Sequence, residues 1–224
     1  MGSMYVKNNE VIYQRKHSSF SKLKYNEVNF NIIFNNNYDW VHFTGITPML
    51  SKESEKIWIR LLEESINRKI KSSIDFNFRP KLGKLEDLWS LVKKYIHNFF
   101  LFVISKNDLF NLSKLENLET NLSTELLLTN FCKKFNVQRC VICIKEMRNR
   151  FQIRYSLLYS NNKIYKSLSR KQNPIENIGG GDSFIGCLIS QYIENKTFEL
   201  DMLDKADFYT INNQNSRGNF SINI

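Results

Sequence analysis

The stretch Ile178-Gly179-Gly180-Gly181-Asp182-Ser183-Phe184-Ile185-Gly186 decides how the rest of the sequence is interpreted. The chain has 8 glycines, and four of them lie in this stretch. The apolar run that continues to Ile193 predicts a buried helix. A glycine turn that opens a helix directs free backbone N–H groups and the positive end of the helix dipole to one point. Such a point suits a phosphate group.

Asp182 lies where the glycine turn meets the predicted helix, and a carboxylate there has two interpretations. At the start of a helix it is often an N-cap that accepts hydrogen bonds from the first turn. Beside an anion site it could instead act as a general base. The residues alone leave both interpretations open.

The same stretch, extended to Glu176-Asn177-Ile178-Gly179-Gly180-Gly181-Asp182-Ser183-Phe184, resembles a known signature. It is similar to the Asp-x-x-Gly-Ala-Gly-Asp-x-Phe of the ribokinase-like, or PfkB-type, carbohydrate kinases. The resemblance implies that Asp182 takes the proton from a sugar hydroxyl, and that Gly179, Gly180 and Gly181 form an anion hole for the transferred phosphoryl group. It implies ATP with Mg²⁺ as the donor and leaves K⁺ open as a further ion.

Two further segments resemble the 2-keto-3-deoxygluconate kinase branch of this family. Asp75-Phe76-Asn77-Phe78-Arg79-Pro80-Lys81-Leu82 is similar to Asp-x-Asn-x-Arg-Pro-Lys-Leu, and Phe43-Thr44-Gly45-Ile46-Thr47-Pro48-Met49-Leu50-Ser51 to Ser-Gly-Ile-Thr-Pro-x-Leu-Ser. The resemblance implies that Asn77 and Arg79 bind the substrate. A guanidinium grips a carboxylate with two parallel bonds, which suits a sugar acid. The alternative is that Arg79 is an ordinary surface charge.

The segment from Tyr13 to Leu23 is similar to the Tyr-x-Arg-x-x-Ser-Ala-x-Ser-x-Leu of the same branch. The resemblance implies that Tyr13 and Arg15 hold the sugar acid. An exposed hairpin carries aromatic and basic residues in any case, and this is the alternative.

The resemblance assigns the nucleotide to Asn107, Lys145, Gly218 and Asn219, and each match departs from the family pattern. Asn107 lies in a segment that lacks the family's glutamate, and it could instead be a helix cap. Lys145 replaces an arginine and keeps the charge without the fork geometry; an ordinary exposed lysine is the alternative. Gly218 and Asn219 match a terminal Gly-Asp-Phe in which Asn219 replaces the acid.

The bulk composition indicates one globular domain. The chain has 224 residues, 42% of them hydrophobic and 13% aromatic, and no apolar run reaches membrane-spanning length. We expect Met1-Gly2-Ser3 to be the remnant of an expression tag, residues 4–224 to form one domain, and the protein to be cytoplasmic. The net charge of +10 is spread without a block of like charges, so we expect neither a membrane nor nucleic acid as partner.

The four cysteines do not predict a metal site. Cys140 and Cys143 form a lone Cys-x-x-Cys without a second pair or clustered histidines, and positions three apart on a strand point to opposite faces. Buried, reduced thiols are the expected state in a reducing compartment.

The order of predicted elements indicates an α/β fold. Two short strands lie around residues 7–10 and a short helix falls within 26–34. Strands then alternate with helices in a sequence that predicts a doubly wound, mostly parallel sheet. The predicted strands are 39–44, 72–77, 99–104 and 138–145, with a hairpin over 150–167; the predicted helices are 51–70, 84–97, 118–135, the one after the glycine turn, and 200–212. Ligands bind beyond the carboxyl ends of the strands in such sheets.

About the first third of the family pattern has no counterpart in this sequence, and residues 4–23 match only a remnant of its lid strands. The sheet then has an uncovered edge, which is an association hazard, so a homo-oligomer is a candidate assembly. Two functions follow from the resemblance. One is a carbohydrate kinase that phosphorylates a sugar or sugar acid. The other is a catalytically impaired remnant that binds nucleotide or sugar.

Overall fold

The computed structural model describes residues 4–7, 10–13, 15, 18–148, 151–172, 174–175, 179–196 and 198–215; of residues 4–7, 10–13 and 148 it describes the backbone only. The chain divides into two compact units, Met1–Phe100 and Leu101–Ile224, here called the N-terminal and the C-terminal unit. Each is described by itself. In the described residues no helix has the length and apolar character needed to cross a membrane.

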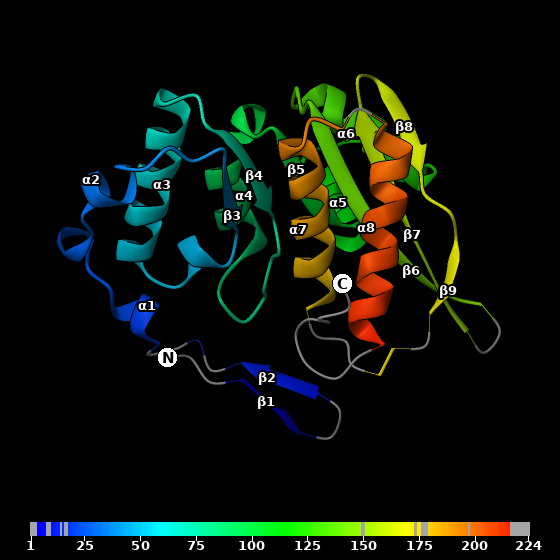
Figure 1. Ribbon diagram of the computed structural model, residues 1–224, viewed down its shortest axis with the longest axis horizontal. Helices are drawn as coiled ribbons and strands as arrows, with labels where there is room; N and C mark the ends of the chain where they lie inside the picture. Colours follow the sequence, from blue (N-terminus) through cyan, green and yellow to red (C-terminus); the bar gives the residue numbers. More distant parts are fainter. Residues whose placement is uncertain are drawn as a thin grey trace. The chain divides into compact units, whose positions relative to one another are not determined.

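The N-terminal unit contains an antiparallel hairpin and a parallel strand pair with its helices (Figure 1). Its elements are β1 (Met4–Lys7), β2 (Glu10–Tyr13), α1 (Ser19–Lys22), η1 (Tyr25–Glu27), α2 (Phe30–Ile33), β3 (Trp40–Thr44), η2 (Thr47–Met49), α3 (Lys52–Asn67), β4 (Lys71–Asp75), α4 (Leu85–Val92) and η3 (Ile96–Asn98). The hairpin and both strands of the parallel pair lie where the sequence predicts strands. The helix predicted for residues 84–97 is divided between α4 and η3.

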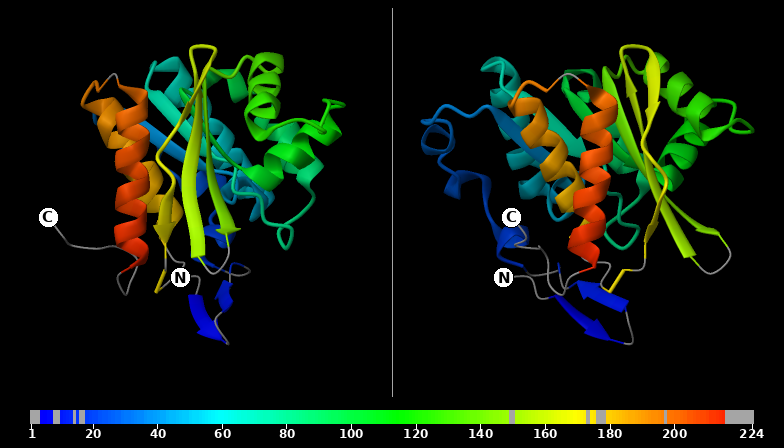
Figure 2. Two further views of the ribbon diagram at one scale, coloured as in Figure 1. Left: turned by 90° about the vertical axis from the view of Figure 1, so that its right-hand side faces the viewer. Right: turned by 45° about the vertical axis from the view of Figure 1, so that its right-hand side comes forward.

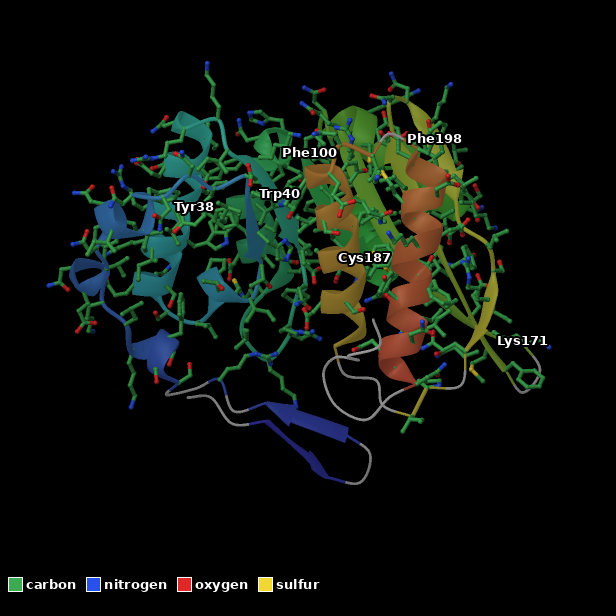
Figure 3. All side chains as sticks on the ribbon, in the orientation of Figure 1. Tyr38, Trp40, Phe100, Lys171, Cys187 and Phe198 are labelled. Atoms are coloured by element: carbon green, nitrogen blue, oxygen red, sulfur yellow. The ribbon has the colours of Figure 1, made fainter. Side chains whose placement is uncertain are left out.

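The long helix α3 is formed by a cap and an apolar face. The Ser51 hydroxyl accepts a hydrogen bond of 3.1 Å from the Ser54 N–H, which satisfies a donor that a helix start leaves unpaired. Trp58 on the buried face is 1% exposed, packs edge-on against Phe43 and lies tilted beside Phe99, with ring centroids 6.4 Å apart. Figure 3 shows a second aromatic contact in this unit, where Trp40 lies beside Phe100 with ring centroids 5.1 Å apart.

The C-terminal unit is a sheet with helices on both faces. Its elements are β5 (Leu101–Ser105), α5 (Lys106–Leu115), α6 (Thr124–Lys134), β6 (Arg139–Arg148), β7 (Phe151–Ser160), β8 (Lys163–Lys166), β9 (Arg170–Gln172), α7 (Gly180–Ile193) and α8 (Glu199–Gln214). Figure 2 shows α7 and α8 on one face of the strands and α5 and α6 on the other. The predicted α/β, doubly wound fold is therefore confirmed.

The strand directions show where the parallel pattern ends. The pairs β3–β4 and β5–β6 are parallel, as the alternation of strands and helices predicts. The strands β7, β8 and β9 are antiparallel to their neighbours. Two residues separate β6 from β7 and β7 from β8, which is too short for the crossover that a parallel pair needs.

In this unit one helix was not predicted, and another begins later than predicted. Helix α5 was not predicted, because its short apolar pattern directly continues strand β5 and the two read as one segment. The helix predicted from residue 118 begins at Thr124, where the Ser123 hydroxyl accepts from the Leu126 N–H at 3.2 Å. The cap therefore decides where the helix starts, although the apolar pattern begins earlier.

A buried ion pair joins β7 to α8. Arg154 is 2% exposed and Asp207 is fully buried. The Asp207 carboxylate accepts hydrogen bonds from Arg154 Nε at 2.7 Å, Ser156 Oγ at 2.9 Å and Ser167 Oγ at 2.6 Å. The Arg154 guanidinium also lies 5.5 Å from the centre of the Phe184 ring on α7. This cluster fixes both helices on one face of the sheet.

Candidate active site

The glycine turn has a backbone that glycine favours. Gly179 occupies the N-cap position of α7 with a φ of 69°, in the left-handed region that other residues rarely adopt. Its carbonyl accepts the Ser183 N–H at 2.9 Å, which closes the first helical turn. The N–H groups of Gly180, Gly181 and Asp182 have no acceptor among the described residues, as expected at a helix start. With respect to these residues, the three N–H groups are open to an anion.

Helix α8 supports the turn from the side. Gly180 is buried, and a Cβ there would lie 2.5 Å from Gln214 Nε2. The Thr210 hydroxyl lies 3.3 Å from the Gly180 carbonyl oxygen. A Cβ on Gly181 would meet no atom within 4 Å. One side of the turn is thus packed and the other is open.

Asp182 is the third residue of α7 and is exposed. Gly179 holds the N-cap position, and Asp182 makes no hydrogen bond to backbone in the described part of the chain. The N-cap interpretation of Asp182 was therefore wrong. Its side chain is exposed in the first turn of α7, and no ion-pair partner of its carboxylate lies among the described residues.

In the N-terminal unit, the ends of β3 and β4 lie together. Gly45 follows β3 and donates its N–H to the Asp75 carbonyl at 2.8 Å. A side chain at Gly45 would collide with the carbonyl oxygen of Phe76, so this close approach requires glycine. Asn77 follows with a φ of 42°. Arg79 is exposed, and no described residue pairs with its guanidinium.

A cavity of about 520 Å³ lies in the same unit, between η2, the start of α3 and the segment after Arg79. Both segments that resemble the 2-keto-3-deoxygluconate kinase branch contribute to it, through Pro48 and Met49 and through Leu82. Asn77 and Arg79 do not line it. The structure therefore separates the two predicted substrate residues from this cavity.

The predicted nucleotide residues are only partly described. Lys145 lies on β6 opposite Arg154 of β7, and its side chain reaches the surface. Desolvation by the surrounding protein atoms, together with the nearby Arg154 charge, lowers the pKa of Lys145. Asn107 is exposed in the first turn of α5, whose N-cap is Ser105, so the cap interpretation of Asn107 was wrong. Gly218 and Asn219 lie outside the described residues.

The predicted sugar-acid residues Tyr13 and Arg15 are described to different extents. The backbone of Tyr13 ends β2, and its side chain is outside what the structure describes. Arg15 is half-buried, and its carbonyl accepts the Ser18 N–H at 3.2 Å. Their contact with a substrate stays a prediction.

The structure brings the glycine turn and Asp182 together in the C-terminal unit, and Gly45, Asn77 and Arg79 at the strand ends of the N-terminal unit. Sequence reasoning missed Thr210 and Gln214, which hold the turn. Their apolar neighbours give a helix pattern, but nothing in the sequence indicates which polar residue of α8 faces Gly180. The four cysteines are free thiols; Cys132 and Cys140 are buried, as expected, whereas Cys143 and Cys187 are only half-buried. The described residues contain no cluster of three or more metal-binding side chains.

The chain has the ribokinase-like fold of the PfkB carbohydrate kinases. The 2-dehydro-3-deoxygluconokinase of Thermotoga maritima is similar at a TM-score of 0.84 and 20% identity, over 95% of this chain and 65% of that chain. A PfkB family carbohydrate kinase of Listeria grayi is similar at 0.85 and 17%, over 98% and 69%. A fructokinase of Vibrio cholerae, bound to fructose, ADP and a calcium ion, is similar at 0.72 and 14%, over 98% and 69%.

This chain thus spans about two thirds of the length of the solved structures that it resembles. No protein-family model matches the sequence. At these identities the likeness establishes the fold, and the activity has to be argued from the site.

Proposed function

We propose that this protein is an ATP-dependent kinase of the 2-keto-3-deoxygluconate kinase type, which transfers the γ-phosphoryl group of ATP to a hydroxyl of a sugar or sugar acid. The observation that carries the proposal is Asp182, an exposed carboxylate in the first turn of a helix whose first amides have no acceptor among the described residues. A base beside an anion site is the pair that phosphoryl transfer to an alcohol requires.

Each of the predicted site residues has a separate role in the proposed reaction. Asp182 accepts the proton of the attacking hydroxyl, and the amides of Gly180 and Gly181 stabilise the charge on the transferred group. The open side of Gly181 leaves space for that group. Arg79 and Asn77 hold the sugar or sugar acid, with Tyr13 and Arg15 as further contacts. Lys145, Asn107, Gly218 and Asn219 contact the nucleotide.

Mg²⁺, when bound, neutralises the phosphate oxygens. The described residues have no preformed metal cluster, so we propose that the ion arrives with the nucleotide, as Mg²⁺ often does in kinases. The amides of the glycine turn, which have no acceptor in the described part of the chain, fit an anionic group. The site of K⁺ is not assigned to any residue.

The test is ADP formation from ATP with a panel of sugars and sugar acids, 2-keto-3-deoxygluconate included. Asp182→Asn keeps the shape and removes the base, so we expect kcat to fall roughly 10²- to 10⁴-fold. Asp201→Asn is the matched control, because Asp201 is also an exposed acid in the first turn of a helix, α8. Turnover that survives Asp182→Asn unchanged contradicts the proposed mechanism.

The second candidate is a non-catalytic protein of the same fold that binds nucleotide or sugar. The observation that favours it is that the proposed nucleotide residues depart from the family pattern, with Lys145 in place of an arginine and Asn219 in place of an acid. A lysine keeps the charge but loses the two-pronged grip on a phosphate group. This candidate predicts heat of binding in calorimetry with ATP or a sugar, and no ADP formed.

A further inference from the structure

Gly180 and Gln214 occupy one space between α7 and α8. A Cβ built on Gly180 would lie 2.5 Å from Gln214 Nε2, 2.7 Å from its Cδ and 3.2 Å from its Cγ. Real Cβ atoms do not approach other heavy atoms so closely. The middle residue of the glycine turn is therefore glycine because the Gln214 side chain fills the place of a side chain there, and no backbone strain has to be invoked.

Gln214 is itself held on several sides. It is 1% exposed, its side-chain oxygen accepts a hydrogen bond from Gln172 Nε2 at the end of β9, and its backbone carbonyl accepts the Ile175 N–H at 2.9 Å. Thr210, one turn earlier on α8, places its hydroxyl near the Gly180 carbonyl. A buried and hydrogen-bonded side chain cannot move aside cheaply.

We propose that Gln214 is a positioning residue of the glycine turn. It fixes the distance between α8 and the first residues of α7, and so sets where the amides of Gly180 and Gly181 and the carboxylate of Asp182 point. The proposal rests on the proposed function for its effect on catalysis. The steric contact between Gly180 and Gln214 does not depend on the proposed function.

The experiment is a double-mutant cycle in the full chain. Gly180→Ala puts a methyl group where Gln214 lies, so we expect kcat to fall roughly ten- to hundred-fold with little change in KM for the sugar, because misplaced catalytic groups cost mainly in turnover. Gln214→Ala opens the space. The double variant Gly180→Ala, Gln214→Ala should regain most of the activity that Gly180→Ala loses, which is a non-additive result.

Gly186→Ala is the matched control. Gly186 lies on the same helix, and a Cβ there would meet no atom within 4 Å, so kcat should be unchanged. A purely structural role for Gln214 would change the melting temperature without this rescue of kcat. Additive effects in the cycle, or wild-type kcat in Gly180→Ala alone, would overturn the proposal.

Amide hydrogen exchange at residues 180–183 separates this proposal from the proposed function. We expect faster exchange in Gly180→Ala and near wild-type exchange in the double variant. If the wild-type protein shows no turnover, the proposed function fails, and the exchange cycle alone decides whether Gln214 positions the turn. Exchange that is equal in all variants overturns the positioning.

Discussion

At the scale of the residue, Tyr192 is the side chain whose titration has the clearest effect on how stability depends on pH. It lies on α7 and is 7% exposed. Burial raises its pKa from 10.0 to about 12, and the nearby Arg139 opposes that rise. A raised pKa means that the folded state favours the neutral phenol. The stability that this provides is complete below pH 10 and is lost as the pH rises from 10 to 12.

The prediction is that Tyr192→Phe removes this part of the pH dependence. The wild-type free energy of unfolding should fall by about 1 kcal/mol more between pH 9 and pH 11 than that of the variant. Urea unfolding at several pH values measures both slopes. Equal slopes would mean that Tyr192 titrates in the folded protein as it does in the unfolded chain.

The parts of the candidate site that could be predicted from the sequence are those where the local backbone requires one residue type. A triple glycine before an acid and an apolar run indicates a turn with open amides, and the structure places Asp182 there. Gln214 could not be predicted, because it acts through the shape of its contact with Gly180 and not through a pattern in the chain. The sequence also left open whether Asp182 caps α7, and the structure shows that the left-handed Gly179 takes the N-cap position.

At the scale of the element, the attachment of α8 to β7 depends on the buried ion pair between Arg154 and Asp207. Taking one partner away leaves the other charge buried and alone. We therefore expect Asp207→Ala to lower the free energy of unfolding by about 3–5 kcal/mol in urea denaturation.

Asp204→Ala is the control for that measurement. Asp204 lies on the same helix and pairs with Arg170 at 3.0 Å, but both side chains are partly exposed, so its loss should cost about 1 kcal/mol or less. The double variant Arg154→Met, Asp207→Leu should recover most of the stability, because it removes both charges. If Asp207→Ala and Asp204→Ala lowered the free energy of unfolding by similar amounts, the buried pair would have no special role.

Long elements were predicted more reliably than short ones. The spacing of Ile57, Leu62 and Ile66 defines α3, and the Ser51 cap fixes its start. Helix α5 was missed, because strand β5 leads into it at Ser105 without a turn residue. The hairpin predicted over 150–167 is present as the antiparallel pair β7–β8. The pairing of β7 with β6 and β9 was not predicted, because the alternation of strands and helices carries no information about it.

At the scale of the whole molecule, net charge and an open strand edge act against each other. The chain carries +10 at pH 7. Strand β3 pairs with β4 on one side, and no other strand in the described part of the chain pairs with it. Backbone groups at such an edge can pair with another copy, whereas the positive charge keeps copies apart.

The prediction is that association depends on salt. Raising NaCl from about 50 mM to about 500 mM shortens the screening length from roughly 14 Å to roughly 4 Å, so the average mass in sedimentation should increase. The direction of the change distinguishes self-association from association through bound nucleic acid, because binding to nucleic acid would weaken as the salt concentration rises. An average mass that falls or stays constant would show that the β3 edge does not drive self-association.

The contact at Gly45 has a consequence for how the chain avoids misfolding. A slip of β3 by one position against β4 would bring Thr44 or Ile46 to the place where Gly45 meets the Phe76 carbonyl. Neither side chain fits there, since even a single methyl would collide. The wrong alignments are therefore excluded by volume as well as by the loss of hydrophobic contacts, and the segment that carries Asn77 and Arg79 leaves the sheet at one defined point.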